Sequence, residues 1–289
     1  MKNLPAIDWK RTDTLIALAL EEDLGDLGDT TTNAVIPADL VTDAVFLAKE
    51  DLICAGLPVA ERLFRTLDPA VQWQGLVKEG EFCPKGTLLA KVHGPARILL
   101  TGERTALNFL QRLSGVATAS GKYQAAAGNS CLILDTRKTT PGWRNLEKYA
   151  VAVGGAFNHR IGLYDRIMIK DNHRELAGLE GAGGIIRSVQ RARKMYPELE
   201  IEVEVDSLSE LAEAVESGAE YILLDNMSTE MMAEAVRMNR GRAKLEASGN
   251  ITIERLPEIA AVGVDFASSG ALTHSVKSSD ISLEITPLA

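Results

Sequence analysis

The chain has 289 residues and a formal net charge of −9, with 46% hydrophobic and 25% charged residues. This length suits one barrel or two modest domains, and the composition is ordinary for a soluble globular protein. The acidic balance argues against a broad nucleic-acid-binding face, which would require a positive surface. The first ten residues lack the apolar core of a secretory leader, and the early apolar run 15–20 is too short to span a bilayer.

The three cysteines, Cys54, Cys83 and Cys131, lie far apart and form no CxxC or Cys/His metal spacing. They are typical of reduced, mostly buried thiols. We therefore expect a cytoplasmic protein without disulfide bonds.

The first 113 residues mix helical and strand patterns. Helices are predicted at 9–24, 58–67 and 96–113, a polar loop at 25–33, and strands at 41–48, 71–77 and 88–92. Arg104 lies close to the apolar stripe of the third helix, and by itself it is typical of an arginine on a helix surface.

After Gly115 short apolar runs alternate with helical patterns, which indicates parallel βαβ units. Strands are predicted at 132–134, 167–169, 201–205, 221–224, 244–247 and 264–267, and helices at 184–196, 208–217 and 228–239. The late units recur about every 20 residues, which favours a barrel, but six strands are two fewer than a complete (β/α)₈ barrel has.

We therefore predict an α/β protein with two domains: a mixed α/β N-terminal sandwich domain, residues 1–113, and a six-stranded open α/β barrel, residues 114–275. The tail, residues 276–289, alternates like an edge strand and is expected to return to the first domain.

All six predicted barrel strands end in polar residues or glycine, and in parallel α/β folds these strand ends collect the reactive groups. The residues at these ends are Asp135, Arg137 and Lys138; Lys170 and Asp171; Glu204 and Asp206; Asp225 and Asn226; Ser248, Gly249 and Asn250; and Ser268, Ser269 and Gly270. This edge of the barrel is the predicted active site.

The turns Ser248–Asn250 and Ser269–Gly270 are candidate phosphate sites. Glycine lets the backbone approach an anion, and backbone N–H groups then bind it. A single short glycine turn is common, but two on neighbouring late strands match the usual place of a barrel phosphate site.

Glu202 and Glu204 share one face of their strand, because side chains alternate. Two inward carboxylates need cations, which Lys170, Lys244 or a Mg²⁺ carried by a phosphorylated ligand could supply. Asp225 adds a third carboxylate. A purely structural layer of ion pairs remains the alternative.

Residues 135–173 form a basic cluster within an acidic chain, which indicates a focused anion site. Arg137, Arg160 and Lys170 are the candidate anion clamp, since guanidinium groups match carboxylates bidentately. His159 could donate to a carboxylate, although a lone loop histidine usually has no special role. Lys170 also permits a second hypothesis, a Schiff base of the aldolase type.

Taken together, these segments closely resemble the quinolinate phosphoribosyltransferase family along almost the whole chain. The matching stretches are 22–25, 28–31, 94–97, 103–108, 113–115, 135–142, 154–155, 158–163, 169–173, 202–205, 223–226, 245–249 and 270–274. The resemblance implies a pentosyltransferase that joins quinolinate to phosphoribosyl pyrophosphate with Mg²⁺. The products would be nicotinate mononucleotide, CO₂ and pyrophosphate, a step of de novo NAD biosynthesis.

The resemblance also implies how the acceptor is held. Arg137, His159, Arg160 and Lys170 would hold the two quinolinate carboxylates, and Arg104 would reach the same site from the partner subunit of a homodimer.

For the other substrate, Lys138 would meet the pyrophosphate, and Glu204 and Asp225 would contact the ribose hydroxyls directly or through Mg²⁺. The two turns, with Ser248, Gly249 and Asn250 in one and Ser269, Gly270 and Ala271 in the other, would bind phosphate through backbone N–H groups. Ser269 stands where the family often has valine, and Trp143 and Phe157 fill variable positions; none of these removes a ligand.

Three other functions remain open. A molybdenum-transport-associated paralogue would share the fold and use another acceptor, but that branch departs around the segment that this chain retains as Lys170–His173. A Schiff-base lyase would use Lys170. A non-enzymatic metabolite-binding protein would keep the phosphate turns and tolerate loss of Glu204 and Asp225.

Overall fold

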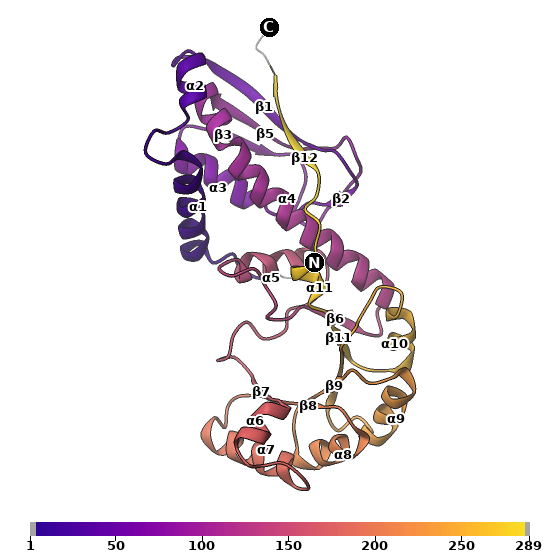
Figure 1. The fold of residues 1–289 in the computed structure, drawn as a ribbon. Coiled ribbons are helices and arrows are strands. Elements are labelled where there is room, and N and C mark those ends of the chain that lie inside the picture. The colour runs from indigo at the N-terminus through magenta and orange to yellow at the C-terminus, as the bar shows by residue number, and fades with distance from the viewer. Residues whose placement is uncertain (1–3, 287–289) are drawn as a thin grey trace. The chain divides into compact units, whose positions relative to one another are not determined.

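The structure, a computed structural model, describes residues 4–286, which group into two compact units (Figure 1). The first unit contains the residues up to Gly121, the segment Thr140–Gly155 and the residues from His274 onward. The second contains Lys122–Thr139 and Ala156–Thr273. The expected first domain did not include Thr140–Gly155, and its residues 1–3 and 287–289 lie outside the described part of the chain.

The first unit contains a four-stranded antiparallel sheet in the order β12-β1-β5-β3. Its strands are β1 (Val41–Ala48), β3 (Gln72–Gly75), β5 (Leu88–Pro95) and β12 (Ile281–Thr286). The strand β12 from the tail lies at the sheet edge and pairs with β1. Two further strands, β2 (Leu52–Ile53) and β4 (Phe82–Cys83), pair with each other.

Among the residues of this unit that the structure describes, five helices start: α1 (Trp9–Leu24), α2 (Thr30–Val35), α3 (Leu57–Leu67), α4 (Ala96–Ala127) and α5 (Arg144–Val153). The prediction of a loop throughout 25–33 is wrong, because α2 begins within it. The Asp29 side chain accepts the Thr32 N–H at 2.9 Å, so this aspartate caps a short helix in a segment without an apolar stripe.

Helix α4 continues 14 residues beyond its predicted end at Leu113. Gly115, which suggested a break, instead serves close packing. A Cβ atom there would lie 2.3 Å from the Lys277 backbone oxygen, so only glycine fits inside the helix at this approach. The sequence pattern could not distinguish a helix-ending glycine from a packing glycine.

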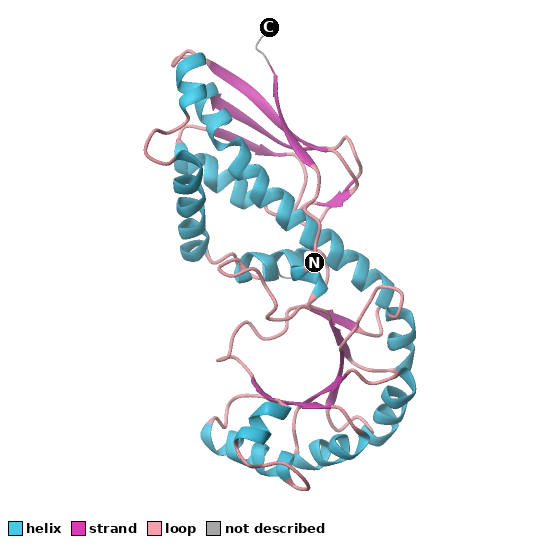
Figure 2. Ribbon diagram, in the orientation of Figure 1, coloured by secondary structure: helices cyan, strands magenta, loops and turns pink. Residues whose placement is uncertain are grey.

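The second unit is built on six parallel strands in the order β6-β11-β10-β9-β8-β7, and Figure 2 shows their curved arrangement. The strands are β6 (Leu132–Leu134), β7 (Ile167–Ile169), β8 (Ile201–Val205), β9 (Tyr221–Asp225), β10 (Lys244–Ser248) and β11 (Phe266–Ser268). Within the described residues β6 and β7 are the two end strands of this sheet and do not pair with each other, so the predicted open six-stranded α/β architecture is confirmed.

Helices alternate with these strands, and the three that were predicted lie within one residue of their predicted ranges. They are α6 (Asp171–Leu176), α7 (Gly184–Met195), α8 (Leu208–Ser217), α9 (Thr229–Asn239), α10 (Leu256–Val262) and α11 (Ala271–His274). The apolar residues of β8, such as Ile201, Val203 and Val205, are buried, which leaves Glu202 and Glu204 on the opposite face.

In the described residues, no helix combines the length and apolar character needed to cross a membrane. Cys54, Cys83 and Cys131 are free and buried, as predicted. Burial raises the pKa of the Cys83 thiol to about 11 and keeps it protonated.

Candidate active site

The carboxyl ends of the barrel strands surround a cavity of about 420 Å³. Its lining residues are Thr136, Arg137, Lys138, His159, Arg160, Met168, Lys170, Glu204, Leu223, Asp225, Glu246, Ser248 and Ser268. Eight predicted site residues thus line one pocket, although they come from six separate chain segments. The turn residues 249–250 and 269–271 directly follow Ser248 and Ser268 in the chain.

Strand register explains this convergence. Glu204 and Glu246 both pair with Leu223 of the strand between them, and Ser248 pairs with Asp225. Because side chains alternate along each strand, these residues face the same side of the sheet. The predicted alignment of strand ends follows from this parallel pairing.

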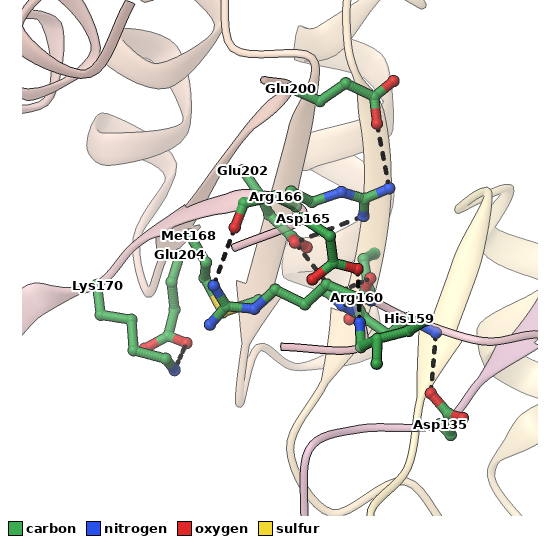
Figure 3. Close-up of polar contacts among 12 residues, drawn as sticks. Asp135, His159, Arg160, Asp165, Arg166, Met168, Lys170, Glu200, Glu202 and Glu204 are labelled. Atoms are coloured by element: carbon green, nitrogen blue, oxygen red, sulfur yellow. Dashed lines mark hydrogen bonds and ion pairs between the residues drawn. The ribbon is translucent and has the colours of Figure 1, made fainter. Parts of the chain in front are cut away.

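At the pocket mouth, the Lys170 Nζ forms an ion pair with the Glu204 carboxylate (Figure 3). The Asp225 carboxylate accepts the side-chain N–H of Asn226 at 2.9 Å. Lys244 was an expected cation for this layer, and that expectation is wrong. Its Nζ lies 2.6 Å from Asp265, because Lys244 sits at the amino end of β10, a full strand length from the mouth.

Two arginines, Arg137 and Arg160, line the same pocket. Burial, and next the charge of Arg137, lower the pKa of the Arg160 guanidinium. The Arg160 guanidinium donates to the Arg166 backbone oxygen at 3.1 Å and contacts Met168 Sδ at 3.5 Å, which fixes its direction. Two neighbouring guanidinium groups repel each other, so a bound dianion would relieve the repulsion.

His159 lies lower in the pocket and is 7% exposed. Its Nε2 is 3.0 Å from Glu202 and 3.4 Å from Glu246, and both carboxylates are buried. Its Nδ1 accepts the backbone N–H of Arg160 at 2.7 Å. Both ring nitrogens therefore face groups of the protein itself.

The sequence did not reveal the structural role of Asp135. It is fully buried, and its carboxylate accepts the His159 backbone N–H at 2.9 Å and the Asn158 side-chain N–H at 2.7 Å. Phe157 forms a short parallel bridge with Leu134 of β6. The segment before His159 is thus attached to the open edge of β6, which carries His159 and Arg160 into the barrel. The signal available in the sequence for this role was an aspartate directly after an apolar strand.

The first candidate phosphate turn requires its glycine. Gly249 has φ +86°, and a Cβ atom there would lie 2.1 Å from the Asn226 side-chain oxygen. Asn250 also has a positive φ, +51°, a conformation that asparagine tolerates better than most residues. This backbone geometry exposes successive N–H groups of the kind that bind anions.

In the second turn, Ser269 is already engaged. Its backbone N–H donates to Leu134 at 3.0 Å and its hydroxyl to the Ile251 backbone oxygen at 3.3 Å. Gly270 and Ala271 follow at the start of α11. Arg104 is exposed on α4 and belongs to the first unit.

An open α/β barrel whose strand ends gather guanidinium, ammonium and carboxylate groups around one cavity defines an enzyme that acts on anionic substrates. Two family models match this chain. The model "Quinolinate phosphoribosyl transferase, N-terminal domain" covers residues 29–114, and "Quinolinate phosphoribosyl transferase, C-terminal domain" covers residues 116–284. The chain belongs to the quinolinate phosphoribosyltransferase family.

Curated relatives and solved structures agree with this assignment. A chloroplastic nicotinate-nucleotide pyrophosphorylase [carboxylating] of Arabidopsis thaliana is 44% identical over 97% of this chain and 84% of that protein. A probable nicotinate-nucleotide pyrophosphorylase [carboxylating] of Synechocystis is 44% identical over 96% of this chain and 93% of its own length. The crystal structure of NadC from Streptococcus pyogenes matches with a TM-score of 0.93 and 39% identity, covering 99% of this chain and all of that chain.

Proposed function

We propose that the strand-end pocket is the active site in which this chain performs the reaction of its family. The protein is a quinolinate phosphoribosyltransferase (decarboxylating) of de novo NAD biosynthesis. It transfers phosphoribosyl from phosphoribosyl pyrophosphate to quinolinate and produces nicotinate mononucleotide, CO₂ and pyrophosphate. The observation that carries the site assignment is the meeting of Arg137, Arg160 and Lys170 with Glu204 and Asp225 in one cavity.

Quinolinate carries two carboxylates on adjacent ring carbons, and the cationic wall of the pocket fits such a dianion. Arg137, Arg160 and Lys170 contact the carboxylates, and His159 contributes from beneath, where its ring supports Arg160. Arg104 completes the acceptor site from the partner subunit of a homodimer. The mutual repulsion of Arg137 and Arg160 supports this assignment, because it disappears when an anion binds.

Phosphoribosyl pyrophosphate occupies the other side of the pocket. Lys138, which is exposed at the pocket edge, binds the pyrophosphate, and the turns Ser248–Asn250 and Ser269–Ala271 bind the 5′-phosphate. Within the second turn Gly270 and Ala271 provide the N–H groups, since the Ser269 N–H is bound to Leu134.

Glu204 and Asp225 also suit Mg²⁺, which prefers a few carboxylate oxygens together with substrate phosphates and water. Both lie on adjacent strands and line the same cavity. When bound, Mg²⁺ would neutralise charge on the leaving pyrophosphate. The carboxylates would hold the ribose hydroxyls, directly or through the metal.

The pocket favours a dissociative transfer. As the bond from the anomeric carbon to pyrophosphate breaks, positive charge develops on the ribose, and Glu204 and Asp225 stabilise it. The quinolinate nitrogen forms the new bond to the anomeric carbon. The 2-carboxylate then leaves as CO₂, and the cationic ring accepts the electron pair of the broken carbon–carbon bond. A proton takes the place of the carboxylate on the ring carbon. The clamp mainly orients the two substrates, so no histidine base is required.

Two properties accompany this proposal. The protein acts as a homodimer, because the acceptor site needs Arg104 from a second chain. It works in the cytoplasm, which the free, buried cysteines support. Gel filtration with light scattering and cell fractionation test these two points.

One assay tests the activity itself. Purified protein is mixed with quinolinate, phosphoribosyl pyrophosphate and Mg²⁺, and CO₂ and nicotinate mononucleotide are measured together. We expect equal amounts of both products, none with excess chelator, and recovery when Mg²⁺ is restored. Absence of product with all three components would refute the activity, and full activity in chelator would refute only the role of Mg²⁺.

A further inference from the structure

The buried cluster of His159, Glu202 and Glu246 lies below the substrate-binding groups, and the transfer reaction described above gives its two glutamates no role. The side chains of the two glutamates are at most 1% exposed, and they come from different strands, β8 and β10. Two buried carboxylates are costly unless they are compensated. Packing of the barrel interior is therefore not a sufficient reason for this cluster.

The first part of a sufficient reason is geometric. His159 Nε2 lies within 3.4 Å of both carboxylates, so side chains from both strands contact the Nε2 side of the ring. The ring in turn accepts the Arg160 backbone N–H through Nδ1. On the other side, Asp135 accepts the His159 backbone N–H. The junction between His159 and Arg160 is thus fixed from three strands, β6, β8 and β10.

The second part is the charge on the ring. Burial by itself would lower the pKa of His159, but hydrogen bonds to Glu202 and Glu246 outweigh it and raise the pKa to about 9. These carboxylates favour a hydrogen on both ring nitrogens, whereas the Arg160 N–H requires a lone pair on Nδ1. Both forms place a hydrogen on Nε2, the nitrogen that lies 3.0 Å from Glu202 and 3.4 Å from Glu246. Nε2 is therefore available neither to a substrate carboxylate nor to a metal.

Other charged groups around the ring do not change this assignment. Arg166 lies on the far side of Glu202, with a guanidinium nitrogen 3.7 Å from that carboxylate. Burial, followed by the charge of Glu202, raises the pKa of Glu246. Figure 3 shows His159, Arg160 and Glu202 converging in this region.

We propose that Glu202 and Glu246 are positioning residues for the acceptor, which hold His159 through Nε2 so that Arg160 faces the quinolinate carboxylates. This inference rests on the proposed function of the pocket. The two glutamates act through His159 and Arg160 and do not touch either substrate. Their effect is confined to acceptor binding, since Arg160 is assigned to quinolinate and not to the ribose.

Two isosteric variants, Glu202→Gln and Glu246→Gln, test the proposal, with Glu200→Gln as matched control. Glu200 immediately precedes β8, its side chain is 54% exposed, and it pairs with Arg166 instead of the ring. Each substitution replaces a carboxyl group next to Nε2 with a neutral amide of the same shape. We expect the quinolinate KM to rise about tenfold, the coupling expected within one hydrogen-bond network, while kcat and the KM for phosphoribosyl pyrophosphate change less than about twofold.

Nitrogen-15 NMR of histidine-labelled protein provides a second measurement that does not depend on activity. The chain has four histidines, and a His159→Asn variant identifies the signal of interest. In the wild-type protein, Nε2 of His159 should keep its hydrogen from about pH 6 to 9, with or without quinolinate. In the Glu202→Gln/Glu246→Gln double variant the ring should titrate closer to the ordinary value of about 6.5.

The outcomes separate the two hypotheses. Kinetic constants of both glutamine variants equal to those of Glu200→Gln would overturn the positioning role. A wild-type His159 that loses its Nε2 hydrogen near pH 6.5 would also overturn it, and so would a divalent metal that the wild-type protein holds and the Glu202→Gln/Glu246→Gln double variant does not. If a variant fails to fold, the wild-type spectrum still decides. Failure of the wild-type protein to make nicotinate mononucleotide would instead refute the function while leaving the NMR result valid.

Discussion

The pocket mouth and the pocket floor contain similar residues in different environments. On β8, Glu204 at the mouth is partly exposed and pairs with Lys170, a flexible cation. Two residues earlier, Glu202 at the floor is completely buried and pairs with His159, a rigid ring. Both side chains face the same side of the sheet, yet only the mouth residue can reach a ligand. Depth along the strand, and not residue type, separates the substrate-binding layer from the supporting layer.

This difference has an energetic reason. A partly exposed ion pair such as Lys170–Glu204 contributes little to stability, about 0–1 kcal/mol, so a substrate can rearrange it at small cost. A buried network resists rearrangement, because a lost partner leaves an uncompensated polar group. The mouth can therefore exchange partners during the reaction, whereas the floor preserves the geometry.

The largest expected effect concerns the mouth carboxylates. Asp225→Asn should lower kcat by roughly 10²–10³, because it removes a charge that stabilises the developing cation on the ribose. Steady-state kinetics with both substrates measure this loss. Asp206→Asn is the matched control, since Asp206 follows β8 but does not line the cavity, and it should retain wild-type kcat. Retention of more than about a tenth of kcat in Asp225→Asn would contradict the assignment.

Lys170→Met should raise the quinolinate KM by about 10–100-fold, the usual cost of a lost charge-assisted hydrogen bond. The exposed Lys194 near the end of α7 offers a control, and Lys194→Met should change nothing. The wild-type protein, which retains Lys170, decides the Schiff-base hypothesis. Borohydride added with a carbonyl substrate should trap no adduct at Lys170 in mass spectra, because the Lys170 Nζ is engaged by the Glu204 carboxylate. A trapped adduct would favour the lyase.

Arg104→Ala should raise the quinolinate KM by about tenfold if the arginine contacts a carboxylate in the partner subunit. Mixing it with Lys138→Ala protein should restore activity to about a quarter of wild type. Half of the random dimers are then mixed, and each contains one intact site. Lys138→Ala mixed with Glu204→Gln is the control, and it should recover nothing because both changes damage the same barrel. Lack of recovery despite proven subunit exchange would argue against sharing.

Much of this arrangement could be predicted from residue order. The strands at 132–134, 167–169 and 201–205 were located by short apolar runs, and parallel pairing then aligned their ends. Glu202 was expected to point into the barrel, but its partners in the floor could not be predicted. His159 and Glu246 are separated by 87 positions, and only strand order and register bring them together. Likewise, Gly115 looked like a helix end because close packing against Lys277 leaves no local pattern.

Lys244 provides the smallest expected effect. It also tests strictly whether depth along the strand decides which side chains bind substrate. It lies on β10, two residues before Glu246, and therefore shares its side of the sheet, but its side chain is 60% exposed and pairs with Asp265. Lys244→Met should leave kcat and both KM values within about twofold of wild type and change the free energy of unfolding by less than about 1 kcal/mol. Chemical denaturation and steady-state kinetics measure both. A loss of activity comparable to that of Lys170→Met would show that charge at the amino end of a strand reaches the mouth, and depth would no longer explain which residues bind substrate.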